Sequence, residues 1–102
     1  MDRIALLTEV LSQNPTDAFA RYGLAMEYSN SGDDERALQE FARLLATHPD
    51  YTAGYFMAAQ TLTKADRTEE ARKMLAEGIA SAKKTGNGHA QAEMEGMLAE
   101  LG

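Results

Sequence analysis

The sequence predicts an all-α fold of about six antiparallel helices that pack as successive helix–turn–helix pairs. Apolar residues recur at three- and four-residue steps through most of the chain, which is the period of one helical face. No run of residues alternates between apolar and polar as a strand would. The pattern of one helix pair also returns after 34 residues. Together these features indicate a helical repeat.

The repeat is visible in both directions from the middle of the chain. Adding 34 to a residue number leads from Phe41 to Leu75, which are both large and apolar. Subtracting 34 leads from Phe41 to Leu7 and from Pro49 to Pro15. Because the pattern recurs 34 residues before and 34 residues after this stretch, we identify Ala18–Pro49 as the repeating unit of the chain.

The first two helices are predicted from their apolar faces and from the signals that end them. The first covers about Asp2 to Gln13, with one apolar side made of Ile4, Leu7, Val10 and Leu11. Pro15 ends it, because proline excludes its predecessor from the helical region. Thr16 or Asp17 then caps the second helix, which runs to about Asn30.

A third helix is predicted from Asp34 to Thr47. Gly32 precedes it and can adopt a positive φ, which ends the second helix. Asp33 or Asp34 can cap the new helix. Its buried face is expected to contain Ala37, Leu38, Phe41, Leu44 and Leu45.

Three further helices complete the chain. The fourth runs from Tyr51 or Thr52 to Lys64, and the fifth from a capping Thr68 to about Lys84. Residues 85–88, Thr-Gly-Asn-Gly, form the plainest break in the sequence. The sixth helix covers His89–Leu101.

The repeat resembles the tetratricopeptide repeat, in which a large residue, Leu-Gly, Tyr, Ala, an aromatic and Pro follow at fixed spacing. The matching residues here are Leu24-Ala25, Tyr28, Ala37, Phe41 and Pro49, while Arg21 replaces the large aromatic residue. The resemblance implies a right-handed α-α superhelix, a solenoid that forms one domain over residues 1–102. Within it we expect a half repeat at 1–15, full repeats at 18–51 and 52–85, and a C-terminal capping helix at 88–101.

In this family ligands usually lie in a concave groove lined by the first helix of each pair. Excluding the packing positions leaves an apolar surface rich in methionine and aromatic residues, which suits an apolar peptide or helix. The expected partner-binding residues are Phe19, Tyr22, Met26, Asn30, Phe56, Met57, Gln60, Lys64, Met94 and Met97. Gly23 is expected on the same face, as a close-packing site or a tolerated change.

The resemblance therefore implies a protein–protein interaction module, a scaffold that binds a protein or peptide partner. Two alternatives remain open: the sixth helix covers the groove, or the groove forms a homodimer. The acidic-tail clamp of some family members is not expected, since Tyr22, Met26 and Met57 occupy its Lys and Asn positions.

Composition argues against several other functions. A net charge of −6 disfavours nucleic acid and anionic membranes as partners. With no cysteine, neither a disulfide nor a thiolate site is possible. His48 and His89 lie in separate breaks, so we expect no enzyme activity, metal or cofactor. A cytoplasmic location is the expectation, because the N-terminus lacks a signal-like apolar stretch.

Overall fold

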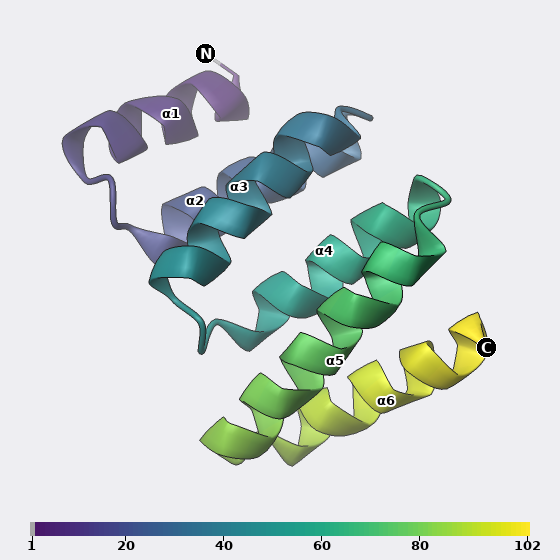
Figure 1. The fold of residues 1–102 in the computed structure, drawn as a ribbon. Helices are drawn as coiled ribbons and strands as arrows, with labels where there is room; N and C mark the ends of the chain where they lie inside the picture. Colours follow the sequence, from purple (N-terminus) through teal and green to yellow (C-terminus); the bar gives the residue numbers. More distant parts are fainter. Residues whose placement is uncertain (1) are drawn as a thin grey trace.

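The structure is a computed structural model that describes residues 2–102. It contains six α-helices and, within those residues, no strand. Consecutive helices lie against each other in an extended stack that measures 40 × 29 × 18 Å (Figure 1). The helices are α1 (Arg3–Gln13), α2 (Ala18–Asn30), α3 (Asp34–Thr47), α4 (Thr52–Lys64), α5 (Thr68–Thr85) and α6 (Gly88–Leu101).

Side chains just before four of the helices satisfy amide groups of the first turn. Asp17, not Thr16, caps α2 by accepting from the amide of Ala20 at 3.0 Å. Asp33, not Asp34, caps α3 in the same way, and Asp2 and Asn87 cap α1 and α6. The predicted cap at Thr68 is wrong. Thr68 is the first residue of α5, and the residue before it makes no side-chain cap bond.

The turns after α2, α4 and α5 share one geometry. Each contains a residue with positive φ, namely Gly32 at 86°, Asp66 at 61° and Gly86 at 72°. The amide of the following residue donates to the carbonyl five positions back, at 2.8 to 2.9 Å. This pair of features is the Schellman motif, which satisfies carbonyls at a helix end. The positive φ predicted for Gly32 is confirmed.

The core lies between successive helix pairs. Phe41 and Leu44 of α3 are buried with alanines of α2, α3 and α4, and Leu75 of α5 is buried with residues of α4 and α6. The fully buried alanines of these helices include Ala25, Ala37, Ala59 and Ala71. A larger side chain at any of them would separate the helices.

Gly78 marks the closest approach of three helices. A Cβ atom there would lie 2.5 Å from Sδ of Met94 on α6 and 2.6 Å from Cβ of Tyr55 on α4. Gly54 similarly faces Leu45, with 3.0 Å from its ideal Cβ to Cδ2. Gly23 is different, since it faces Leu7 of α1 at an ordinary 3.4 Å. The expectation that Gly23 lies on the concave face is therefore wrong, because α1 covers it.

Candidate partner-binding face

The first helices of successive pairs, α2, α4 and α6, approach one another and form what we call the first-helix face. The second helices α3 and α5 lie in front of α2 and α4 in Figure 1, and no Cα atom of one lies within 8 Å of a Cα atom of the other. This arrangement follows from the repeat, because each pair places its first helix on the same side of the stack. The face has two junctions, α2–α4 and α4–α6, which differ in how well they are filled.

Aromatic and methionine side chains fill the α2–α4 junction. The Tyr22 ring lies 5.3 Å from the Tyr51 ring and 6.4 Å from the Phe41 ring, between ring centroids. Met26 and Met57 pack on the same buried cluster and are half-buried. Burial, with a smaller contribution from Tyr51, raises the pKa of Tyr22 above its usual value. These three predicted site residues therefore support the fold as well as facing outward.

Polar contacts continue the same junction. The hydroxyls of Ser29 and Thr61 lie 3.0 Å apart across α2 and α4. The Lys64 ammonium donates to the Ser29 carbonyl at 2.8 Å and pairs with Asp34 at 3.2 Å. Lys64, one of the predicted site residues, thus holds the two helix pairs together. Asn30 is exposed at the end of α2.

An open cleft lies at the α4–α6 junction. Two adjoining hollows of about 240 and about 350 Å³ share Phe56 and Glu93, and together we call them the α4–α6 cleft. The predicted site residues Phe56, Gln60, Met94 and Met97 line it. Its other lining residues are Thr52, Ala53, Asn87, His89, Ala90, Ala92, Gly96 and Glu100.

Two predicted site residues lie in opposite environments. Phe19, near the start of α2, is 70% exposed and is a large apolar side chain open to solvent. Met94, in contrast, is 1% exposed, and its sulfur sits over Gly78 in the core. Met94 was expected on the surface of the groove, but it lines the cleft as a buried residue. The reason is that α6 packs against α5 through this side chain, which forms the base of the cleft.

Sequence reasoning missed the acidic rim of the cleft. Glu93 and Glu100 of α6 both line it, but neither is among the predicted site residues. Their separation of seven residues, two helical turns, was the available signal. Such spacing places both carboxylates on one side of α6, where no Lys or Arg of that helix accompanies them.

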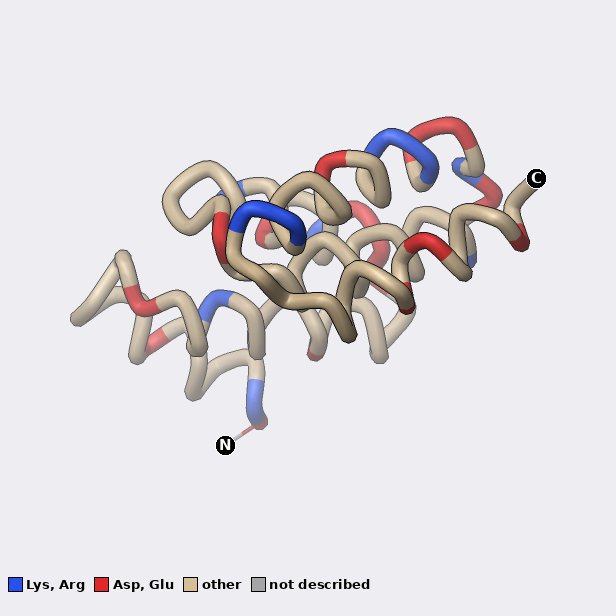
Figure 2. The backbone as a smooth tube through the Cα atoms, turned by 90° about the horizontal axis from the view of Figure 1, so that it is seen from below, with Lys and Arg blue, Asp and Glu red and all other residues tan. Residues whose placement is uncertain are grey.

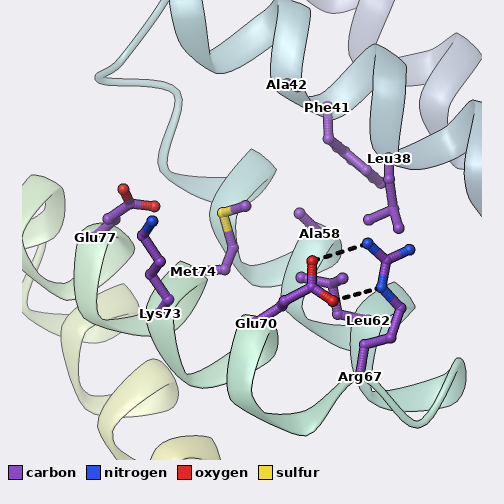
Figure 3. Close-up of a pocket in the computed structure, with 10 residues that line it drawn as sticks. All are labelled: Leu38, Phe41, Ala42, Ala58, Leu62, Arg67, Glu70, Lys73, Met74 and Glu77. Atoms are coloured by element: carbon purple, nitrogen blue, oxygen red, sulfur yellow. Dashed lines mark hydrogen bonds and ion pairs between the residues drawn. The ribbon is translucent and has the colours of Figure 1, made fainter.

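A third hollow, of about 300 Å³, lies on the opposite side of the stack between α3 and α5 (Figure 3). Phe41, Leu62 and Met74 contribute to its apolar floor. On its rim Arg67 donates to Glu70 at 2.6 and 2.8 Å. This hydrogen bonding raises the pKa of Arg67 and lowers that of Glu70. With Lys73 and Glu77 completing the rim, positive and negative charges balance there, so the hollow selects for neither sign.

Features that would suggest catalysis or metal binding are sparse. No group of three or more His, Asp or Glu within residues 2–102 is arranged to hold a metal ion. His48 contacts Thr47, and His89 contacts Glu93, so the two histidines serve separate local interactions. Among the helices of this same stretch, none is both long and apolar enough to cross a membrane.

Comparison with known proteins identifies the family. The tetratricopeptide repeat family model matches residues 4–53 and 30–94. A TPR repeat-containing protein of Pseudomonas aeruginosa is 30% identical over 95 residues, which cover 93% of this chain and 90% of that protein. This chain belongs to the tetratricopeptide repeat (TPR) family. The family resemblance and the all-α superhelical fold predicted from the sequence are confirmed.

Solved structures show the same TPR architecture. A tetratricopeptide repeat domain protein from Salinibacter ruber superposes with a TM-score of 0.81 and 32% identity, over 86% of this chain and 89% of that one. PcrH, solved in complex with the chaperone binding region of PopD, superposes with a TM-score of 0.88. Its 18% identity, over 96% of this chain and 74% of PcrH, shows a shared fold.

Proposed function

We propose that this TPR protein is a scaffold that binds a protein or peptide partner on its first-helix face. The observation that carries the proposal is the α4–α6 cleft, an open hollow beside the half-buried ring of Phe56. Exposed Phe19 extends the same face along α2. Exposed apolar side chains next to a hollow are typical of protein interaction sites.

The fold supports this use. TPR proteins in general mediate protein–protein interaction, and PcrH, which shares the fold, was solved with a region of PopD bound. In the present chain, we assign the direct apolar contacts to Phe19, Phe56 and Met97. Gln60 and Asn30 would orient the partner through hydrogen bonds. No bond is made or broken in this role.

The remaining predicted residues would act from behind the contact surface. Tyr22, Met26 and Met57 fill the α2–α4 junction, and Lys64 ties Ser29 and Asp34 to α4. These contacts hold α2 and α4 at a fixed separation. The partner would therefore meet a preorganised face, which reduces the entropy lost on binding.

The alternative is a homodimer through the same face. A two-fold dimer presents the same surface from both copies. It would place Glu93 and Glu100 of both copies in one interface, between chains that each carry a net charge of −6. An excess of like charge in an interface opposes association. The charge distribution thus favours a different protein as the partner.

Selection from a random peptide library displayed on phage tests the proposal. Peptides retained by the protein would then be measured against Phe19→Asp and Phe56→Gln. We expect the affinity for the peptide to fall about tenfold or more in each variant, since each substitution removes the apolar contact area of one phenyl ring. Leu6→Gln is the matched control, because Leu6 is also an exposed apolar side chain, 50% exposed, but lies on α1. An affinity that is unchanged in both phenylalanine variants would overturn the proposal.

A further inference from the structure

The rim of the α4–α6 cleft carries two carboxylates on one helix. Glu93 lines both hollows and Glu100 lines the second. Their seven-residue spacing on α6 corresponds to a rise of about 10 Å along the helix axis. Phe56 and Gln60 of α4 face them across the cleft. The two acidic groups are therefore spaced to contact two separate positive charges on one bound segment.

These carboxylates lack basic partners within the chain. Helix α6 contains three glutamates and no Lys or Arg, and in Figure 2 it carries red segments and no blue ones up to the C-terminus. Within residues 2–102, no Lys or Arg forms an ion pair with Glu93 or Glu100. In the described part of the chain, the one ion pair of Glu93 is with the largely exposed His89, at 3.2 Å. The negative charge on the rim is thus available to a ligand.

Two basic residues on the helices that contact α6 are engaged with other groups. Lys64 of α4 pairs with Asp34 and donates to Ser29, on the side of α4 that faces α2. Arg72 of α5 pairs with Glu69 and donates to the carbonyl of Leu101 at 2.8 Å. Neither cation neutralises the cleft.

The floor of the cleft is apolar. Phe56, Met97 and Ala53 line it, and the buried Met94 lies beneath them. A floor of this kind takes an aliphatic or aromatic side chain, and gains stability from the apolar area removed from water. An acidic peptide or a nucleic acid would meet repulsion from the rim. A segment that combines apolar and positively charged residues satisfies both parts of the cleft.

We propose that the α4–α6 cleft binds a basic, apolar segment of a partner protein. One apolar side chain of the segment enters the hollow beside Phe56, and flanking Lys or Arg side chains pair with Glu93 and Glu100. This assignment rests on the proposed function and specifies the chemistry of the partner. Because the rim is solvent-exposed, each ion pair contributes modestly to affinity and more to the rate of association.

The peptides selected from the library test this proposal directly. We expect the selected sequences to be enriched in Lys and Arg around an apolar residue. For such a peptide, the double variant Glu93→Gln/Glu100→Gln should lose about tenfold in affinity at low salt, as two exposed ion pairs would give. Raising the ionic strength should shrink this difference, since salt screens exposed charges.

A second double variant controls for net charge. Glu9→Gln/Glu95→Gln also removes two negative charges. Glu9 lies on α1, however, and Glu95 accepts a hydrogen bond from Gln91 outside the cleft. We expect this variant to bind the basic peptides within about twofold of the unaltered protein at the same salt, because neither Glu9 nor Glu95 lines the cleft. Equal losses in the two double variants would show a general charge effect and overturn the proposal.

The remaining outcomes separate the two proposals. Selected peptides that are neutral or acidic but still depend on Phe56 would overturn the basic partner and leave the proposed function standing. Peptides that do not depend on Phe56 would overturn both proposals, as would a library that yields no binder. A mass of two chains by light scattering, lost in Phe56→Gln, would instead identify a second copy as the occupant and overturn the basic partner.

Discussion

Arg21 of α2 and Glu40 of α3 form an ion pair in the interior of the first full helix pair. Nη1 of Arg21 lies 2.5 Å from Oε1 of Glu40, and the two side chains are only 17% and 9% exposed. The same guanidinium donates to the carbonyl of Pro15 at 3.1 Å, and Arg43 pairs with the other oxygen of Glu40 at 2.6 Å. Arg21 stands where the repeat pattern has a large aromatic residue. In this chain an ion pair replaces that aromatic contact between the helices.

Replacing Glu40 with alanine is expected to be strongly destabilising. The change leaves the largely buried guanidinium of Arg21 without its carboxylate, and breaking a buried ion pair typically costs about 3–5 kcal/mol. The free energy of unfolding from urea titration measures this loss. In the double variant Arg21→Met/Glu40→Leu, which removes both charges, most of the stability should return.

Glu35→Ala supplies the comparison for that experiment. Glu35 also pairs with an arginine, Arg67, but its side chain is 78% exposed. An exposed pair contributes at most about 1 kcal/mol. Equal losses in Glu35→Ala and Glu40→Ala would contradict the role assigned to the Arg21–Glu40 pair.

Two glycine substitutions should change stability in opposite directions. Gly78→Ala places a methyl group 2.5 Å from the Met94 sulfur and 2.6 Å from Tyr55, so overpacking of about 1–3 kcal/mol outweighs the better helix propensity of alanine. Gly96→Ala meets no atom within 4 Å and should stabilise α6 by up to about 1 kcal/mol. Thermal unfolding of both variants tests this. Destabilisation of similar size in each would mean that the close approach at Gly78 is not the cause.

Asp66→Gly is expected to stabilise the protein. Asp66 is the one described residue other than glycine with positive φ, at 61°, and it occupies the turn position that Gly32 occupies one repeat earlier. Relief of this strained conformation should outweigh the added flexibility of the unfolded chain by about 0.5 kcal/mol. Urea unfolding measures the change. The reverse test, Gly32→Ala, should cost about 1 kcal/mol or more, and a neutral result there would contradict the explanation.

Tyr22→Phe should reduce the loss of stability at alkaline pH. Burial raises the folded-state pKa of Tyr22 above the ordinary value of 10.0. Tyr22 therefore loses its proton at a lower pH in the unfolded chain than in the folded protein. As the pH rises above 10 toward the folded-state pKa, the free energy of unfolding that Tyr22 contributes is lost. The urea midpoint as a function of pH measures this fall. Its slope above pH 10 should be smaller in Tyr22→Phe, and an unchanged slope would assign the effect to other groups.

The helices were predictable because their signals are local. Asp17, Asp33, Gly32 and Pro15 end or start helices through contacts with residues only a few positions away. The predicted helix boundaries agree with the structure to within about two residues. The predicted cap at Thr68 is wrong because a threonine before two glutamates resembles a capping sequence. In the structure α5 begins at Thr68 without a side-chain cap hydrogen bond.

The candidate site was less predictable, because it depends on how the last helix packs. By the repeat register, both methionines of α6 appeared to be exposed on one surface, yet Met94 is buried over Gly78 at the base of the cleft and only Met97 is half-exposed. The gap at Gly78 that receives the Met94 sulfur has no sequence signal other than the glycine itself. Likewise, Glu93 can be recognised as a cleft residue only from its position beside Phe56, which lies on another helix.

The most direct test of the central claim is amide chemical-shift mapping by NMR with a peptide selected from the library. If the first-helix face is the binding site, the largest shifts should fall on α4 and α6 around Phe56, Gln60, Glu93 and Met97. The amide chemical shifts of Phe41, Leu62 and Met74, around the hollow between α3 and α5, should not change. Shifts concentrated on α3 and α5 instead would place binding on the opposite side of the stack and contradict the account.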